Sequence, residues 1–310
     1  INCSVSHDLQ IMFKSFFFVN CYAASLSCHL LLCLFGGQAG EELNPYCISI
    51  AARACTSIGS YMHSKQIHAI VVKNGFESNT PVMNAIMDMY CRCGSLGEAD
   101  VCFHVMTEKD LITWNTLIAG YEKSYPNKSL KIYSRMELEG ISPNCFTFTS
   151  ILAAVANLAV LSFGEQVHGL IVKRGLEGNL ELDNALIDMY AKCGNIMDSR
   201  KTFDRMPSKN LVSWTSMMIG YGSHGYGKEA VDLFDEMVKS GIMPDRIVFM
   251  AVVGACSHAG LVEEGLRYFT SMVHDYNIKP EQETYGCVVD LLGRAGRVEE
   301  AYELIKSMPF

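Results

Sequence analysis

The stretch NAIMDMYCRCG at residues 84–94 returns as NALIDMYAKCG at residues 184–194, an offset of 100 residues. The match extends without a gap from residues 65–96 to residues 165–196, and the only two tryptophans, Trp114 and Trp214, keep the same offset. Self-similarity at a fixed offset is typical of a repeat array, in which each repeat is one small element stacked on its neighbours. The sequence therefore predicts a repeat architecture.

One helix of each repeat is marked by a recurring pattern. A small residue is followed by apolar residues at i+3 and i+4, and usually by methionine at i+7, as in Ala230, Leu233, Phe234 and Met237. These spacings fall on one face of an α-helix, so each set forms a single apolar stripe. The small residue allows a neighbouring helix to approach closely.

Another apolar run of helical length lies upstream of each stripe, and a glycine separates the two. This glycine is Gly94, Gly194, Gly260 or Gly296 in four repeats. Because glycine just after a helix adopts the left-handed conformation that ends it, each repeat is predicted to be two antiparallel helices. Such a pair cannot bury both faces alone, so consecutive pairs are expected to stack. The predicted fold class is all-α, a right-handed α-solenoid superhelix of stacked helix-turn-helix repeats.

Turn-like sequences containing proline or glycine set the boundaries of the repeats. We place the array at residues 45–310, with repeats at 45–79, 80–110, 111–144, 145–179, 180–210, 211–245, 246–281 and an incomplete 282–310. Repeats of 35, 31 and 34 residues together fill the offset of 100, so the true period is a triplet. Residues 1–44 are an atypical N-terminal segment, for which a hydrophobic membrane or signal segment, a degenerate repeat and a gene-model artefact are all open interpretations.

Composition limits the classes of function. The net charge is −8 at pH 7, which argues against nucleic-acid binding through overall positive charge and requires any such binding to come from a local stripe. The 13 cysteines recur inside helical patterns, as Cys93 and Cys193 do, and we interpret them as free thiols in a reducing compartment. His68 and His168 stand on apolar stripes and are interpreted as packed side chains, and the methionines as core residues.

Residues 211–245, LVSWTSMMIGYGSHGYGKEAVDLFDEMVKSGIMPD, resemble a plant pentatricopeptide repeat. Residues 257–272 and 285–310 resemble the closing repeats of the PLS subclass of that family, and the resemblance covers residues 45–310. It implies a chain truncated before the C-terminal extension and deaminase-like domains of its relatives. It also implies sequence-specific binding of single-stranded organellar RNA, as the site-recognition factor for C-to-U editing, in a mitochondrion or a plastid with the mitochondrion slightly favoured.

In this family each repeat reads about one base with its fifth and last residues. The resemblance therefore assigns base reading to Asn84, Asp110, Asn115, Asn144, Thr149, Asn179, Asn184, Asn210, Thr215 and Asp245, while Ser49 and Asn79 form a further pair. Side-chain amides, hydroxyls and carboxylates can hydrogen-bond to the base edges that an unpaired strand exposes. The family's pairing rules imply U, pyrimidine, A, pyrimidine and G for the repeats of Asn84, Asn115, Thr149, Asn184 and Thr215. Met250 and Gly286 depart from the pattern and receive no base, and helix capping and turn chemistry are an alternative explanation for the polar residues.

The thirteenth residue of four repeats is basic although the chain is acidic. These residues are Arg92, Lys123, Lys192 and Arg294. Registered cations on stacked helices would form a stripe suited to a phosphate backbone, so all four are candidate RNA-backbone contacts. Cations favoured by the dipole at helix C-termini are the alternative.

The chain is not predicted to be an enzyme. Cytidine deamination requires His-x-Glu with a downstream Cys-x-x-Cys to hold zinc, and the sequence contains neither motif. Catalysis would belong to a C-terminal region or to editing-complex proteins acting as partners; no cofactor, metal, small-molecule substrate or membrane is expected. RNA stabilisation, splicing or processing, and a tetratricopeptide-like protein-binding scaffold, are the alternative functions.

Overall fold

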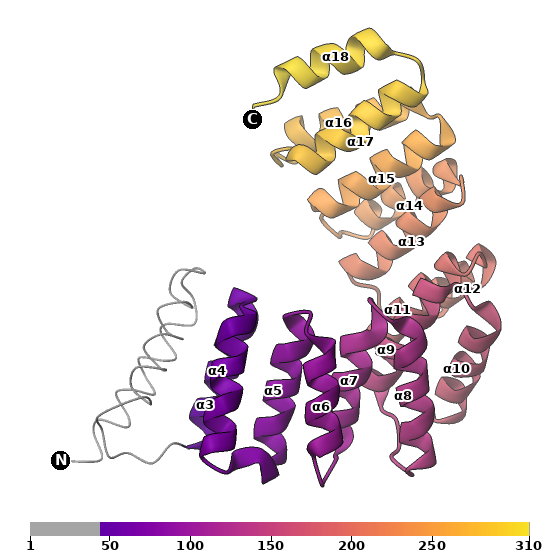
Figure 1. Cartoon of the computed structure of the whole chain (residues 1–310). Coiled ribbons are helices and arrows are strands. Elements are labelled where there is room, and N and C mark those ends of the chain that lie inside the picture. Colours follow the sequence, from indigo (N-terminus) through magenta and orange to yellow (C-terminus); the bar gives the residue numbers. More distant parts are fainter. Residues whose placement is uncertain (1–43, 310) are drawn as a thin grey trace. The chain divides into compact units, whose positions relative to one another are not determined.

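The structure of the chain is a computed structural model that describes residues 44–309. Within this range it contains 16 α-helices and one 3-10 helix, and no strand. The helices form eight antiparallel pairs (Figure 1). The first helices are α3 (Pro45–Ile58), α5 (Thr80–Arg92), α7 (Leu111–Glu122), α9 (Cys145–Leu158), α11 (Leu180–Lys192), α13 (Leu211–Ser223), α15 (Arg246–Ala259) and α17 (Gln282–Arg294).

The second helices are α4 (Tyr61–Lys73), α6 (Leu96–Val105), α8 (Pro126–Leu138), α10 (Leu161–Lys173), α12 (Ile196–Arg205), α14 (Gly227–Lys239), α16 (Val262–His274) and α18 (Val298–Ser307), and the 3-10 helix is η1 (Phe76–Ser78). Each first helix begins at the residue where the sequence pattern places the start of a repeat. The prediction of an all-α array of helix pairs is confirmed. The interpretations of residues 1–44 fall, apart from Asn44, outside the described residues.

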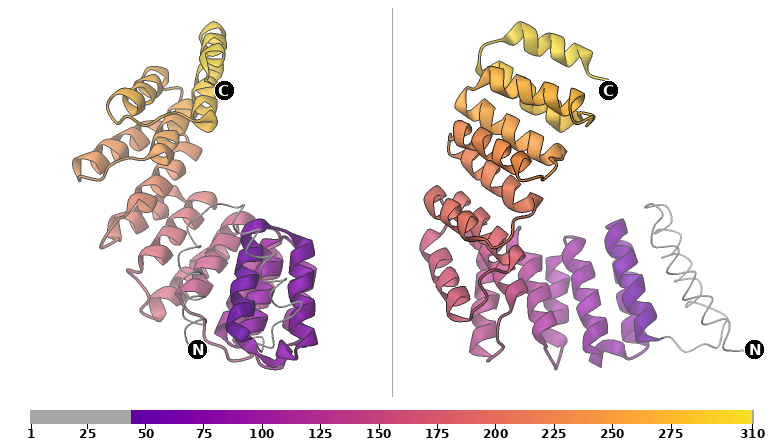
Figure 2. Two further views of the ribbon diagram at one scale, coloured as in Figure 1. Left: turned by 90° about the vertical axis from the view of Figure 1, so that its left-hand side faces the viewer. Right: turned by 180° about the vertical axis from the view of Figure 1, so that it is seen from behind.

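The chain forms two compact parts, an N-terminal part that ends at Pro143 and a C-terminal part that begins at Asn144. In the N-terminal part α5 packs between α3 and α7. In the C-terminal part α9, α11, α13, α15 and α17 follow one another in the same way (Figure 2). Within each part, second helices contact their own first helix and the first helix of the next repeat, as α14 does with α13 and α15. Each part is therefore two layers of helices with the core between them.

The tryptophans anchor the same aromatic contact in both parts. The Trp114 ring lies edge-on to Phe103 with a centroid distance of 4.8 Å, and Trp214 lies edge-on to Phe203 at 5.0 Å. All four rings are buried, and edge-to-face packing adds to the stabilisation from burying their large apolar surface. The offset of 100 residues is thus a repeat of packing as well as of sequence.

The predicted close approach at the small residues is confirmed. A methyl group added at Gly164 would collide with the side chain of Met189, and one added at Gly265 would lie 2.5 Å from Leu291 Cδ2. Methionines fill the core as predicted, since Met237 and Met272 are fully buried. Small residues on the second helix therefore make room for the large side chains of the next repeat.

His68 and His168 are packed side chains, as predicted. His68 Nδ1 lies 3.1 Å from the Tyr90 hydroxyl, and His168 Nδ1 lies 2.8 Å from that of Tyr190. In both pairs the ring centroids are 5.6 Å apart. Burial lowers the pKa of each histidine, although nearby carboxylates partly offset the effect, so both rings are neutral at pH 7.

The separating glycines end their first helices in the predicted conformation. Gly94, Gly194, Gly260 and Gly296 have φ between 73° and 86°. The 145–179 repeat differs, because Ala159 occupies this position with φ 53°, where the 45–79 repeat has Gly59 with φ 66°. An alanine held in the left-handed region is strained.

Replacing Ala159 by glycine should relieve this strain. We expect Ala159→Gly to raise the free energy of unfolding by about 1 kcal/mol, because the left-handed penalty of alanine exceeds the entropic cost of glycine. Urea unfolding followed by circular dichroism checks the change. Gly59→Ala is the matched control and should destabilise the chain by a similar amount; a lower midpoint for Ala159→Gly would contradict the strain.

Candidate nucleic-acid interface

One stripe runs along each first helix. The second, fifth, ninth and thirteenth residues of a repeat are spaced at i+3 and i+4, so they lie on the same face of the helix. On α5 these residues are Pro81, Asn84, Asp88 and Arg92. The candidate base-reading and backbone residues of a repeat therefore share one face with two further positions.

The last residue of a repeat caps the first helix of the next. The side chains of Asn79, Asp110, Asn144, Asn179, Asn210 and Asp245 accept the third backbone N–H of α5, α7, α9, α11, α13 and α15, at distances between 2.8 and 3.1 Å. The capping interpretation is thus confirmed for all six. A cap occupies only one polar atom of the side chain, so the second atom remains to interact elsewhere.

The structure brings the fifth and last residues of the two short repeats together. Asn84 Nδ2 donates to Asp110 Oδ1 at 3.1 Å, and Asn184 Nδ2 lies 3.4 Å from Asn210 Oδ1. Both pairs join residues that are 26 positions apart. In each short repeat a polar pair stands where the first helices of two repeats meet.

Thr149 and Thr215 hold their hydroxyl groups differently. Thr149 Oγ1 donates to the Cys145 carbonyl at 2.9 Å, and Thr215 Oγ1 donates to that of Leu211 at 2.7 Å. A threonine that donates backward to its own helix leaves its oxygen lone pairs as acceptors. Asn115, at the fifth position of α7, is almost fully buried.

Asp110 is ionised at neutral pH. Partial burial alone would raise the pKa of this carboxyl, but the backbone N–H and hydroxyl of Thr113 and the amide of Asn84 outweigh it by hydrogen bonding. Together they hold the pKa of Asp110 below its ordinary value of 3.8. The Asp110 side chain is therefore an acceptor only.

Three of the four candidate backbone cations are already paired. Arg92 Nε lies 3.0 Å from Asp88, Lys192 Nζ 2.8 Å from Asp188, and Arg294 Nε 2.8 Å from Asp290. In the third repeat the ninth residue is Ala119, and Lys123 forms no ion pair among the described residues. In these three repeats the stripe therefore pairs an acid with a base and carries little net positive charge.

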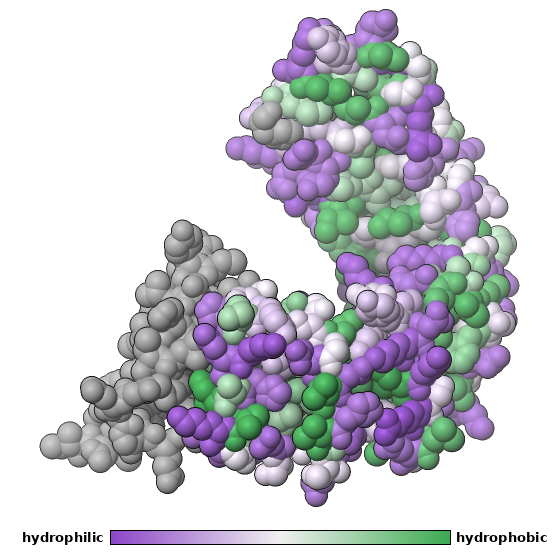
Figure 3. Space-filling view, viewed as in Figure 1, coloured by the Kyte–Doolittle hydropathy of each residue, from purple (hydrophilic) through white to green (hydrophobic). Residues whose placement is uncertain are grey.

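Exposed apolar residues occupy the second position of five repeats, and sequence reasoning missed them. Tyr46, Ile112, Phe146, Val212 and Ile247 are each between 55% and 64% exposed. Figure 3 shows hydrophobic residues interspersed with hydrophilic ones on the viewed surfaces of both parts. Their position in the repeat could have revealed them in the sequence, because each lies one turn before the fifth residue and on the same face of the helix.

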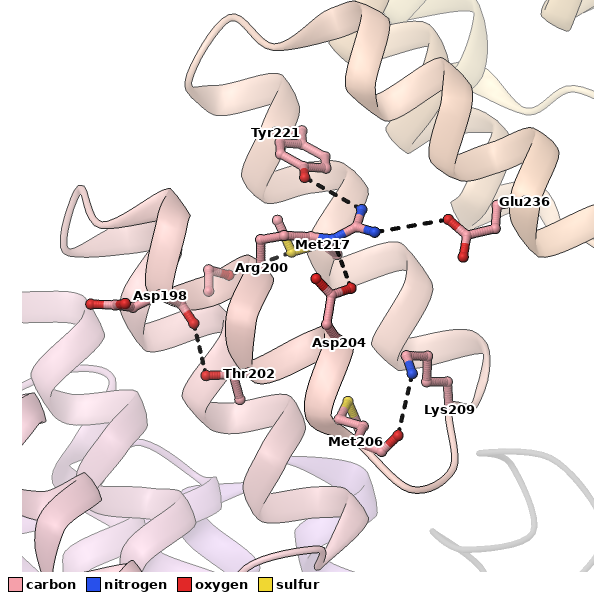
Figure 4. Close-up of polar contacts among 10 residues, drawn as sticks. Asp198, Arg200, Thr202, Asp204, Met206, Lys209, Met217, Tyr221 and Glu236 are labelled. Carbon is pink, nitrogen blue, oxygen red and sulfur yellow. Dashed lines mark hydrogen bonds and ion pairs between the residues drawn. The ribbon is translucent and has the colours of Figure 1, made fainter.

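The lysine before the last residue of each short repeat contacts the end of its own second helix. Lys209 Nζ donates to the Met206 carbonyl at 3.3 Å (Figure 4) and lies 5.0 Å from the centroid of the Phe203 ring. Lys109 makes the same contacts with Met106 and Phe103. Their charges therefore cover the ends of the second helices.

A polar network joins second and first helices in the C-terminal part. Arg200 of α12 donates from Nε to Asp204 at 2.8 Å, lies 3.4 Å from the Tyr221 hydroxyl and 3.9 Å from Glu236 of α14 (Figure 4). The equivalent position in the N-terminal part is Asp100, which pairs instead with Lys128. Both arrangements tie successive repeats together away from the stripe of the first helices.

Neither a metal site nor a membrane span is found in the part of the chain that the structure describes. No group of three or more His, Cys, Asp or Glu side chains is arranged to hold a metal ion there. Within the same residues no helix is long and apolar enough to cross a membrane. The buried thiols of Cys91, Cys102 and Cys256 have pKa values raised to about 12, mainly by burial, so they are poor metal ligands and nucleophiles.

Paired helices, each first helix capped by the last residue of the preceding repeat, define a helical repeat protein. Family profiles described as PPR repeat match residues 82–111, 184–211, 212–242, 247–276 and 283–309, and a profile described as PPR repeat family matches residues 109–157. The chain belongs to the pentatricopeptide repeat family.

The similar proteins are plant proteins. A putative pentatricopeptide repeat-containing protein of Arabidopsis thaliana is 62% identical over 270 residues, which cover 87% of this chain and 44% of that protein. Another protein from the same plant, named chloroplastic, is 40% identical over 293 residues, which cover 90% of this chain and 33% of that protein. A third, named mitochondrial, is 44% identical over 246 residues, which cover 79% of this chain and 40% of that protein. The chain spans less than half the length of these relatives.

The same fold is found among solved structures. The crystal structure of the pentatricopeptide repeat protein PPR10 in complex with an 18-nt psaJ RNA element matches with a TM-score of 0.77 and 23% identity, covering 98% of this chain and 47% of that one. A structure of PPR10 from maize matches with a TM-score of 0.62 and 18% identity, covering 97% and 48%. The predicted α-solenoid fold class is confirmed.

The two roles of Asp110 can be separated by mutation. Asp110→Ala should lower the free energy of unfolding by about 1–2 kcal/mol through loss of the cap, whereas Asp110→Asn keeps a capping oxygen and should change it by a few tenths at pH 7. Because the folded-state pKa is depressed, the wild-type contribution is present above the ordinary pKa of 3.8 and is lost as pH falls through the lower, folded-state pKa.

Chemical denaturation of both variants between pH 7 and pH 2.5 measures these effects. The wild type should lose more stability than Asp110→Asn as the solution is acidified, since asparagine does not titrate. Equal stability of Asp110→Ala and the wild type would mean that this cap contributes nothing.

Proposed function

We propose that this chain binds single-stranded RNA in a sequence-specific manner, with one base per repeat read by the fifth and last residues. The observation that carries the proposal is the pairing of these residues at the junction between repeats, where Asn84 contacts Asp110 and Asn184 contacts Asn210. The same register recurs along the chain, as a ladder of single bases requires. The RNA complex of the protein with the same fold supports this reading.

The cap determines whether the last residue offers a hydrogen-bond donor or an acceptor to a ligand. Because one oxygen accepts the backbone N–H of the next helix, a capping aspartate offers its other oxygen as an acceptor. A capping asparagine offers its NH₂ group as a donor instead. On the Watson–Crick edge, U and G carry a ring N–H donor, whereas C and A carry a ring nitrogen acceptor. Asp110 and Asp245 therefore suit U or G, and Asn179 and Asn210 suit C or A.

The fifth residue completes the assignment in each repeat. Combined with the family's pairing rules, the cap chemistry gives U for the repeat of Asn84, C for those of Asn115 and Asn184, A for that of Thr149 and G for that of Thr215. Read in the order of the repeats, the proposed target is UCACG from 5′ to 3′. The base assigned to the long repeat with Thr149 is the weakest in this set, because the resemblance to the PLS subclass implies that its long repeats read bases less strictly.

The exposed apolar residues supply a surface for the flat faces of the bases. Tyr46 and Phe146 have aromatic rings, on which bases stack with about 1–3 kcal/mol per base. Ile112, Val212 and Ile247 offer aliphatic contact at the same register. Stacking is indifferent to base identity, so these residues would add affinity while the polar pairs select sequence.

We further propose that recognition serves C-to-U editing in a mitochondrion or plastid. The resemblance of residues 257–310 to the closing repeats of the PLS subclass supports this role, and relatives named chloroplastic and mitochondrial support an organelle. Deaminase activity would come from a C-terminal region or from editing-complex proteins. The repeats at residues 45–310 would then place one cytidine at a fixed distance from the bound sequence.

Selection of RNA by the full 310-residue chain tests the proposal. A randomised single-stranded RNA pool is bound at two salt concentrations and the retained molecules are sequenced. Enrichment of UCACG supports both register and function. Absence of enrichment by a chain with helical circular dichroism overturns RNA reading and favours a protein-binding role.

Changing one reader should change one base. We expect Thr215→Asn to shift the preference of its repeat from G toward U by about 1–2 kcal/mol, since an amide replaces a hydroxyl beside the same Asp245 acceptor. Fluorescence anisotropy with RNAs that differ at this nucleotide measures the shift. Thr215→Ser keeps the hydroxyl and serves as control; an unchanged preference for G would remove the base assignment of this repeat.

Releasing the paired cations should strengthen binding without changing specificity. Asp88→Asn with Asp188→Asn frees Arg92 and Lys192 for phosphate, so affinity should rise for all RNA sequences and the salt slope should steepen by about 1–2. Titration at several salt concentrations measures both quantities. Glu229→Gln with Asp232→Asn on α14 is the control for net charge, because it removes the same two negative charges off the stripe. Equal slopes for the double variant and the control would exclude Arg92 and Lys192 as backbone contacts.

A further inference from the structure

The third residue of each first helix from α5 to α17 falls into two chemical classes. It carries a hydroxyl in Thr113, Thr147, Ser213 and Thr284, and it is apolar in Val82, Leu182 and Val248. All seven side chains are completely buried. Burying a hydroxyl is costly unless the group finds a hydrogen-bond partner. We therefore expect a partner for the third residue in the hydroxyl class and none in the apolar class.

The class follows the fifth residue of the preceding repeat. The repeats before Thr113, Thr147 and Ser213 carry asparagine at that position, namely Asn84, Asn115 and Asn184. The repeats before Val82, Leu182 and Val248 carry Ser49, Thr149 and Thr215. A buried hydroxyl therefore accompanies an asparagine reader, and an apolar residue accompanies a hydroxyl reader.

Thr113 shows the physical basis of this association. Its Oγ1 accepts the Asp110 backbone N–H at 3.2 Å and lies 2.8 Å from both Asn84 Oδ1 and Asp110 Oδ1. The single hydroxyl proton is within reach of both oxygens. Asp110 Oδ1 also accepts the Asn84 amide and the Thr113 backbone N–H, whereas Thr113 is the one hydrogen-bond donor to Asn84 Oδ1 among the described residues.

This network fixes which way round the Asn84 amide lies. Its oxygen faces the buried hydroxyl, and one of its N–H bonds points to Asp110. The second N–H is left for an external acceptor. The reader is thereby held as a donor beside the Asp110 acceptor, the pattern that complements a pyrimidine such as U.

Hydroxyl readers need no such support. Ser49, Thr149 and Thr215 donate their single proton to the carbonyl four residues earlier, at 3.1, 2.9 and 2.7 Å. Their own helix therefore fixes their orientation. An added hydroxyl at Val82, Leu182 or Val248 would have no amide to meet.

Two buried polar atoms lack the contact that Thr113 makes. Thr284 follows a repeat with Met250 at the fifth position, and its buried Oγ1 has no hydrogen-bond partner among the described residues. Ser213 Oγ lies 3.0 Å from Asn210 Oδ1, and the buried Asn184 Oδ1 has no partner in the same part of the chain. Ser213 therefore does not hold the Asn184 amide as Thr113 holds that of Asn84.

We propose that Thr113, through its buried hydroxyl at the third position of α7, is a positioning residue that orients Asn84, the asparagine reader of the preceding repeat, and so sharpens its choice of base. The inference rests on the proposed function. It assigns specificity to a residue that does not touch the RNA.

Thr113→Val removes the hydroxyl and preserves shape. We expect the preference for U over the other bases at the nucleotide read by Asn84 to fall about fivefold, the effect of one buried hydrogen bond, with preferences at the other nucleotides unchanged. Anisotropy with RNAs varied one nucleotide at a time measures both. Thr113→Ser keeps the hydroxyl and should retain most of the preference, which separates orientation from a general packing defect.

A second test introduces the pair of asparagine reader and buried hydroxyl into another repeat. It does not depend on removing a cap contact. Thr215→Asn alone creates an asparagine reader over the apolar Val248, and it should discriminate weakly. Adding Val248→Thr should restore discrimination about fivefold, because the new hydroxyl can hold the new amide. Val248→Thr alone leaves the wild-type preference for G in place, since Thr215 donates to its own helix.

The outcomes distinguish the inference from its premise. A wild-type chain that shows no preference at the nucleotide of Asn84 overturns the base-reading function and the positioning role together. A wild-type preference that survives intact in Thr113→Val, in a variant that melts cooperatively, overturns the positioning role alone. Equal discrimination by Thr215→Asn with and without Val248→Thr has the same meaning.

Discussion

The hydrogen bond from the first turn of each first helix to the last side chain of the preceding repeat is the contact on which the array depends. A helix begins with unsatisfied N–H groups, and Asp110, Asn179, Asn210 and Asp245 each satisfy one of them. The capping oxygen belongs to one repeat and the N–H to the next, so this bond sets the junction between repeats. It also decides which atom of the side chain is left for a ligand. The cap and the proposed base recognition thus depend on the same side chain, and exchange of aspartate for asparagine keeps the cap while it changes the group left for a ligand.

Much of the fold could be predicted from the sequence because it depends on local spacing. Gly94 and Gly260 mark helix ends through a conformational preference of glycine itself, and the set from Ala230 to Met237 lies on one face whatever surrounds it. The ion pairs of Arg92 and Lys192 were equally accessible, since Asp88 and Asp188 stand four residues earlier on the same helix. Recognising them would have tempered the expectation of a positively charged stripe.

The missed parts of the candidate site depend on which helix faces which. Ile112 and Phe146 look like core residues in the sequence, and only the packing of first helices shows that their positions stay exposed. Thr113 looks like an ordinary residue in the first turn of a helix, and its contact with Asn84 spans 29 positions. No periodicity encodes such a contact. It exists because α5 and α7 lie side by side at a distance that small side chains set.

In an acidic chain whose stripe cations are mostly paired, phosphate contacts can contribute little to the proposed binding of RNA. Nonspecific affinity for a polyanion grows with the number of unpaired cations, and here three of four candidate cations are held by a carboxylate one turn away. The proposed base contacts must therefore supply a larger share of the binding free energy, and a wrong base costs relatively more. Groups whose orientation is fixed before the ligand binds are therefore favoured, because they lose less conformational entropy on binding. Asn84, Asp110 and Thr113 form such a closed network, whereas Asn184 and Asn210 are joined by one long contact of 3.4 Å. The two short repeats, nearly identical in sequence, should therefore differ in how strictly they select a base.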